Sequence, residues 1–116
     1  MANVNNPTDC PITITLAFIG GRWKTVILYF LASGTRRFGE IAARMPAISR
    51  KVLTEQLKEL ERDNLINRVY YREIPPRVEY SLTDRGRSLA KVLDEMANWG
   101  LANAPAYDDQ YVVSGS

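Results

Sequence analysis

The sequence predicts a single α+β domain that is mostly helical and contains one two-stranded hairpin. Apolar residues recur at helical spacing in several segments, whereas the segment 66–82 is rich in β-forming residues and ends in strict alternation. The chain has 116 residues, of which 46% are hydrophobic. Length and composition of this kind are typical of one globular domain, and we expect no second domain of ordinary size.

Two helices are expected in the first third of the chain. Pro11 suits the first position of a helix and Gly20-Gly21 suit its C-terminal end, so we expect a helix over 11–19. The β-branched run Ile12–Thr15 alone would favour a strand, and the two boundary signals decide for the helix. The second helix ends near Ser33-Gly34. Its apolar residues recur at helical spacing: Trp23, Val26, Ile27, Phe30 and Leu31.

A short helix, a proline-containing turn and a longer helix are expected next. The short helix spans 38–44 and stops at Met45-Pro46-Ala47, because proline disfavours helix in the residue before it. Ser49 lies where a helix N-cap is needed, and the segment 50–62 is rich in strong helix formers. The apolar face of this longer helix consists of Leu53, Leu57 and Leu60.

The period changes after residue 65. We expect strands over 66–72 and 77–82, joined by a protruding loop because Pro75-Pro76 lacks the N–H groups that a strand ladder needs. Thr83 suits the cap of a final helix. Its apolar positions are Leu89, Val92, Leu93, Met96 and Trp99. We expect residues 1–9 to form a flexible lead, 10–103 the folded domain and 104–116 a flexible tail.

The order of these elements is that of a winged helix-turn-helix, in which the hairpin is the wing. Several motifs stand at spacings typical of one family, and the set is more specific than any single motif. They are Cys10-Pro11, Ile19-Gly20-Gly21-Arg22-Trp23, Phe38-Gly39-Glu40-Ile41, Leu53-Thr54 with Leu57 and Leu60, Pro75-Pro76-Arg77-Val78-Glu79-Tyr80-Ser81-Leu82-Thr83, and Gly86. Over about residues 10 to 102 the chain resembles the HxlR-type winged helix-turn-helix transcriptional regulators.

The distribution of charge agrees with a polyanionic partner. The net charge is only +2, but all 15 Lys and Arg lie between residues 22 and 91, where 8 of the 13 acids occur, so this segment carries +7. The two flanks hold the other 5 acids and no base. A basic middle suits binding to nucleic acid, and a solvated surface of mixed charge is the alternative.

Several classes of function are excluded by composition. The chain has no histidine and one cysteine, which rules out Ser-His-Asp and Cys-His catalysis and the usual zinc sites. We therefore expect no enzyme, no metal and no cofactor. The longest apolar run, Val26–Ala32, is far shorter than the ~20 residues of a membrane span. A lone cysteine agrees with a reducing, cytoplasmic location.

The longer helix of the helix-turn-helix carries the residues that would meet double-stranded DNA. Its N-terminal turns face base edges in the major groove, and its N-terminus attracts phosphate. We expect base contacts from Arg50, Lys51 and Thr54, with Ser49 at the helix start and Lys58 on a phosphate. Wing or backbone contacts are expected from Arg36, Arg37, Arg72 and Arg77. The alternative is that these are solvated surface residues.

The first and last helices carry none of the expected DNA contacts, and we expect them to form the dimer interface. The apolar stripe of the last helix is longer than a small domain readily covers, and the resemblance implies a homodimer that reads an inverted repeat. The alternative is that the stripe covers the core of the monomer. The residues expected at the dimer interface are Ile12, Leu16, Leu89, Val92, Leu93, Met96 and Trp99.

Cys10 is a candidate redox sensor. It precedes Pro11 at the expected start of a helix, where the helix dipole favours the thiolate. The resemblance implies sensing of oxidants or electrophiles, since several HxlR-type regulators use a cysteine at this position. A buried cysteine acting as a small hydrophobic residue is the alternative.

The sequence therefore predicts a homodimeric, sequence-specific regulator of transcription with Cys10 as its candidate switch. The alternative is a winged-helix module that binds other proteins and has no sequence-specific DNA binding. The basic middle segment favours the first interpretation.

Overall fold

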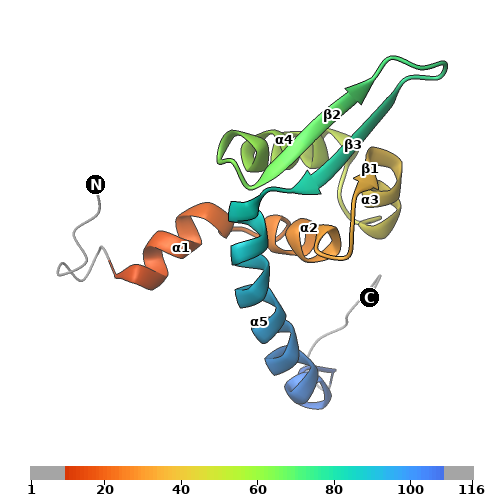
Figure 1. Cartoon of the computed structure of the whole chain (residues 1–116). Coiled ribbons are helices and arrows are strands. Elements are labelled where there is room, and N and C mark those ends of the chain that lie inside the picture. The colour runs from red at the N-terminus through yellow and green to blue at the C-terminus, as the bar shows by residue number, and fades with distance from the viewer. Residues whose placement is uncertain (1–9, 109–116) are drawn as a thin grey trace.

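The computed structural model describes residues 10–108, which form five helices and a three-stranded sheet (Figure 1). The elements in chain order are α1 (Pro11–Ile19), α2 (Lys24–Leu31), β1 (Arg36–Arg37), α3 (Phe38–Arg44), α4 (Arg50–Arg62), β2 (Ile66–Tyr71), β3 (Arg77–Leu82) and α5 (Asp84–Asp108). The predicted winged helix-turn-helix is confirmed, with α3 and α4 as the helix pair and β2–β3 as the wing.

The sheet has one strand more than the sequence predicts. β1 is two residues long and pairs with β3 in antiparallel register, Arg36 opposite Tyr80 and Arg37 opposite Glu79. The strand order is β1-β3-β2. The expected two-stranded wing is present as β2 and β3, and β1 adds a third strand to its sheet. Two residues carry no periodicity, so β1 had no signal of its own.

The hairpin of β2 and β3 protrudes from the body of the domain (Figure 1). Its register runs from Ile66 opposite Leu82 near the body to Tyr71 opposite Arg77 near the loop. Side chains alternate between the two faces of the hairpin, and the face with Ile66, Tyr80 and Leu82 is buried. The inner half of the hairpin therefore belongs to the core, and its outer half is free to reach a partner.

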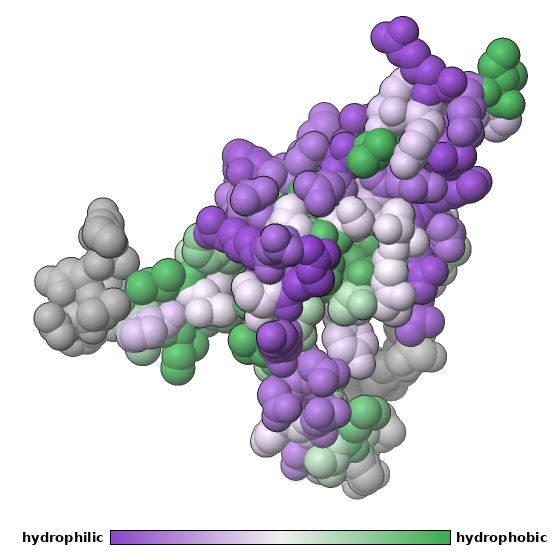
Figure 2. Space-filling model, viewed as in Figure 1, coloured by the Kyte–Doolittle hydropathy of each residue, from purple (hydrophilic) through white to green (hydrophobic). Residues whose placement is uncertain are grey.

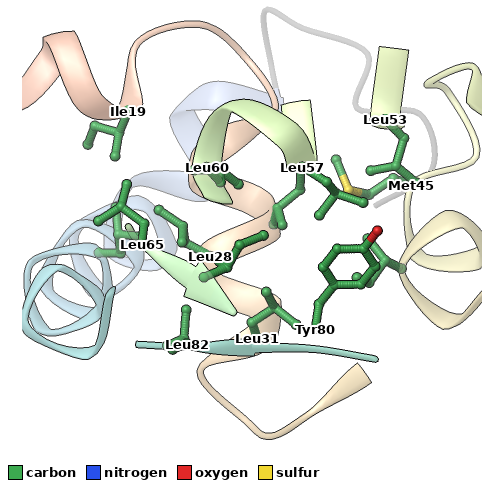
Figure 3. Packing of buried hydrophobic residues seen from close by; sticks show 14 residues of the cluster. Ile19, Leu28, Leu31, Met45, Leu53, Leu57, Leu60, Leu65, Tyr80 and Leu82 are labelled. Carbon is green, nitrogen blue, oxygen red and sulfur yellow. The ribbon is translucent and has the colours of Figure 1, made fainter. Parts of the chain in front are cut away.

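The hydrophobic core lies between α2, α4 and the sheet. Figure 3 shows Leu57 and Leu60 of α4 on one side of this cluster and Leu82 of β3 on the other, with Leu28 of α2 between them. The predicted inward face of α4 is confirmed, because Leu53, Leu57 and Leu60 are all buried. Burial of this face fixes which side of α4 remains exposed to solvent.

The start of α5 is held against the turn between α4 and β2. The Thr83 hydroxyl accepts a hydrogen bond from Gly86 N at 2.9 Å and donates one to Asn64 O at 2.8 Å. A Cβ at Gly86 would lie 2.1 Å from Leu65 O, so only glycine allows this approach. The predicted cap at Thr83 is confirmed, and it fixes the direction in which α5 leaves the body.

The helix α5 continues to Asp108, so the expected domain boundary at residue 103 falls inside a helix. Residues 104–108 are helical where a tail was expected. Alanine is the best helix former, and the expectation gave the small residues of this segment too much weight as loop residues. The expected flexible lead over 1–9 and the rest of the tail lie outside the described residues.

The helices α1 and α5 extend away from the core in different directions (Figure 1). The Cα radius of gyration is accordingly 15.9 Å, against about 13 Å for a compact chain of about 100 residues. Over residues 10–108 no single helix is long and apolar enough to cross a membrane. Together α1 and α2 reach the length and hydropathy required, with a bend of 80° between them.

Candidate nucleic-acid interface

The helix α4 presents a polar face to solvent. Ser49 is its N-cap, and the Ser49 hydroxyl accepts a hydrogen bond from Val52 N at 3.1 Å, as the sequence predicts. Arg50, Lys51 and Lys58 are exposed and Thr54 is half-buried. The five predicted recognition residues therefore lie at the start or on the accessible side of one rigid helix.

Hydrogen bonds and ring contacts orient two of these side chains. The Thr54 hydroxyl donates a hydrogen bond to Arg50 O at 2.7 Å. Because the hydroxyl proton is used in this bond, the methyl group of Thr54 is the part left for an apolar contact with a partner. The Arg50 guanidinium lies 5.5 Å from the centre of the Phe38 ring. Both contacts pre-order the N-terminal turns of α4, where base contacts were predicted.

The acids of α4 do not neutralise its exposed lysines. Within the described residues neither Lys51 nor Lys58 takes part in an ion pair. Glu59 binds Lys24 of α2 instead, and Arg62 lies 3.8 Å from Asp63. The two lysines are therefore available to an anion, on a face that also exposes Glu55.

The ion pair of Lys24 and Glu59 joins α2 to α4. Lys24 is only 8% exposed, and its Nζ lies 2.8 Å from Glu59 Oε1. The hydrogen bond from Lys24 and its charge hold the pKa of Glu59 below its ordinary value. This pair was not predicted, because the two residues are 35 positions apart and nothing local distinguishes them. It fixes the C-terminal half of α4 on the body.

Arg77 does not act as the free cation of the wing that the sequence predicts. Its Nη1 donates to both carboxylate oxygens of Glu73, at 2.7 and 2.9 Å, and its Nε lies 3.1 Å from Glu79. Its guanidinium also stacks 4.0 Å from the centre of the Tyr71 ring. Arg77 therefore braces the wing, and a DNA contact from it stays a prediction. Arg72 is exposed and in no ion pair of the described chain, so its guanidinium is available to a partner.

The arginines of β1 differ in the same way. Arg36 is half-buried, donates to the Ser33 hydroxyl at 2.9 Å and lies 4.9 Å from the centre of the Phe30 ring. Arg37 has an exposed side chain, while its backbone N–H donates to Glu40 Oε1 at 3.0 Å. Arg37 is therefore the better placed of the two for a phosphate contact.

Most of the predicted dimer residues are exposed. Trp99 is 71% exposed and Ile12 69%, and Leu16, Val92 and Met96 are exposed as well. Leu89 is half-buried at the edge of the core. Leu93 corrects the prediction, since it is 4% exposed and lies in the core of the monomer. Beside these residues a groove of about 310 Å³ lies between α1 and α5, lined by Ile14, Thr15, Phe18, Leu65, Arg85, Ser88, Leu89 and Val92.

Cys10 occupies the N-cap position of α1, as predicted. Its carbonyl oxygen accepts the first hydrogen bond of the helix, from Ile14 N at 3.2 Å. The side chain is a free thiol and is half-buried. Among the described residues no group of three or more His, Cys, Asp or Glu side chains could hold a metal ion.

Comparison with known proteins gives one consistent result. Residues 18–108 match the family model described as HxlR-like helix-turn-helix. The relative YdeP of Bacillus subtilis (strain 168), named an uncharacterized HTH-type transcriptional regulator, is 50% identical over 91 residues, which cover 78% of this chain and 71% of the relative.

Two solved structures are similar in fold and sequence. The redox regulator HypR in its reduced form has a TM-score of 0.80 and 40% identity, over 85% of this chain and 98% of that chain, and HypR is also solved in its oxidized form. The reduced form of the transcriptional regulator YodB from B. subtilis has a TM-score of 0.67 and 39% identity, over 78% of this chain and 90% of that chain. A diamide-treated form of YodB is solved too.

Proposed function

This chain belongs to the HxlR-like helix-turn-helix family, and from that membership we propose a sequence-specific regulator that binds double-stranded DNA as a homodimer. The observation that carries the proposal is the exposed face of α4. It presents Arg50, Lys51 and Lys58, which are in no ion pair of the described chain, and the Thr54 methyl group, while the opposite face of the helix is buried in the core. The proposed activity is binding, and it assigns no catalytic group.

The contacts proposed for α4 follow from its geometry. Arg50 and Lys51 stand at its N-terminal turns, which enter the major groove in helix-turn-helix proteins. Their donors suit the guanine O6 and N7 acceptors, and the Thr54 methyl group suits a thymine methyl group. Lys58 lies two turns further along and suits a phosphate. Ser49 accepts from Val52 N, and the other N-terminal N–H groups of α4 suit a phosphate of the DNA backbone.

Dimerisation is proposed through α1 and α5. These helices extend away from the core and carry exposed apolar residues, from which water would be released in a symmetric dimer. A two-fold dimer carries two copies of α4. If these lie about 34–36 Å apart, they meet successive major grooves, and the operator is an inverted repeat.

A redox response is proposed for Cys10. HypR is a redox regulator and YodB is also solved after diamide treatment, and these similar proteins support the same chemistry here. Because the sequence contains no second cysteine, oxidation of Cys10 gives an inter-subunit disulfide, a mixed disulfide or a sulfenic acid, and an electrophile gives an adduct. The proposed inducer is an oxidant or electrophile, and the proposed site of action is the cytoplasm.

Selection of duplexes from a random pool by the purified protein, in reducing and oxidising buffer, tests the proposal. We expect enrichment of an inverted repeat, with affinity that falls steeply with salt as counterions are released. Recovery of no common sequence, with equal affinity for every duplex, would contradict sequence-specific binding. That result would favour the protein-interaction module.

A further inference from the structure

The far end of the wing carries an apolar side chain that the described chain leaves uncovered. Ile74 lies in the loop between β2 and β3, and its exposed fraction is 103%. Figure 2 shows hydrophobic atoms at this end of the wing, on a protrusion whose sides are mostly hydrophilic. An isoleucine this exposed contributes no burial to the monomer, and its apolar surface would be removed from water only by a partner.

The loop that holds Ile74 is braced from both sides. Pro75 and Pro76 follow it and fix their own φ angles. Arg77 then binds Glu73 and Glu79 and stacks on Tyr71, which ties the end of β2 to the start of β3. A side chain presented on a braced loop loses little conformational entropy when it is buried by a partner.

The surroundings of Ile74 suit a polyanion with an apolar interior. Arg72 lies two residues before Ile74, and it is exposed and in no ion pair of the described chain. A groove of about 410 Å³ runs between the end of the wing and the start of α3. Its lining includes Ile74, both prolines and the exposed Arg37, while the one acid in it, Glu73, is paired with Arg77.

These features match the minor groove of duplex DNA. An apolar side chain that enters this groove meets base edges and sugars, and a phosphate backbone runs along each side of it. One backbone would lie in the groove beside Arg37, and the exposed Arg72, which does not line that groove, would be available to the other. An apolar surface of another protein could bury Ile74, but it would leave Arg37 and Arg72 without anionic partners.

We propose that Ile74 is an apolar wedge that enters the minor groove next to each half-site and bends the DNA there. The inference rests on the DNA binding proposed above and adds a specificity-determining residue to it. Wedges of this kind partly unstack a base step, and pyrimidine–purine steps unstack most easily. The selected operator should therefore carry a TA or CA/TG step where the wing reaches the DNA.

The test uses the full chain and a DNA duplex that the parent protein has selected from the random pool. The duplex is labelled at both ends, so that energy transfer between the labels measures its bend. Ile74→Ala should weaken binding roughly tenfold for each protomer, because most of the apolar side chain is lost. The bend should decrease, and the dependence of affinity on salt should stay as in the parent. Ile74→Leu should keep most of the affinity and of the bend.

Arg72→Ala is the matched control for charge. It should reduce the slope of log affinity against log salt by about 0.9 for each protomer, which Ile74→Ala does not do. Both side chains are exposed, so all three variants should unfold at the temperature of the parent protein.

Parent-like affinity and bend in Ile74→Ala would overturn the wedge while leaving the proposed function intact. Failure of the parent protein to select any duplex would overturn both.

Discussion

Lys24 Nζ lies 2.8 Å from Glu59 Oε1, and this contact ties the recognition helix α4 to α2 across the edge of the core. The two partners are unequal, because the Lys24 side chain is 10% exposed and the Glu59 side chain 37%. A buried ammonium group depends on its partner more than a half-exposed carboxylate does. Substitution of Lys24 or Glu59, neither of which is proposed to contact DNA, is therefore expected to affect the position of α4.

We predict that Glu59→Gln lowers the melting temperature more than Lys24→Met does. The first change leaves a buried ammonium without its counter-charge, whereas the second replaces the lysine by an apolar residue of similar length. Thermal unfolding followed by circular dichroism measures both. Equal melting temperatures for the two variants would show that the buried charge is compensated in another way.

The same pair predicts a dependence of stability on pH. The pKa of Glu59 is lowered by the hydrogen bond and charge of Lys24, so the unfolded chain binds a proton at Glu59 more readily than the folded chain. The contribution of the pair is present above the ordinary pKa of 4.5 and is lost as the pH falls through the lower pKa of the folded state. Urea unfolding from about pH 6 to about pH 3 should show a steeper loss in the parent than in Lys24→Met.

Lys51→Ala is predicted to relax base preference. The lysine is exposed on the N-terminal turns of α4, and one good base contact discriminates against a wrong base by about 1–3 kcal/mol. Binding to the selected operator and to single-base variants of it measures this loss, and Lys91→Ala on α5 is the matched control. If Lys51→Ala lowers affinity for every sequence equally, its contact is with a phosphate.

Dimerisation should depend on the outer face of α5. Met96→Asp and Trp99→Ala change exposed side chains, so we expect folded monomers near the chain mass of 13.1 kDa in sedimentation at micromolar concentration. Val69→Asp changes an exposed apolar residue of the wing and should remain dimeric. A parent protein that is already monomeric at this concentration would contradict the proposed interface.

The response to oxidants should require Cys10. Diamide or a quinone should change operator affinity at least several-fold in the parent, because the thiol lies beside the proposed dimer surface of α1. Cys10→Ser should bind the operator as the reduced parent does and should not respond. A parent-like response in Cys10→Ser would show that the sensor is not this thiol.

The helix-turn-helix could be predicted from local signals. Ser49 and the leucine stripe defined α4 with the bounds that the structure has, since capping and amphipathicity are properties of neighbouring residues. The role of Arg77 was not predicted, because Glu73 and the Tyr71 ring come close to its guanidinium only when the loop and the hairpin form. The place of an arginine beside a loop in the sequence does not show whether its side chain forms ion pairs within the folded chain.

Contacts between distant segments account for the other differences. The strand β1 exists because Arg36 and Arg37 pair with β3 more than 40 positions away. Leu93 belongs to the helical stripe of α5, but only the approach of the core shows that it is buried while Val92 and Met96 are not. The sequence pattern identified the apolar side of α5 and could not divide it between core and interface.

The most direct test of sequence-specific binding is an equilibrium titration of the dimer against its selected inverted repeat and a scrambled duplex of the same length. We predict binding to the repeat at least about 10³-fold tighter at physiological salt, with affinity for both duplexes falling as salt rises. Equal affinity for the two duplexes at every salt concentration would contradict the account.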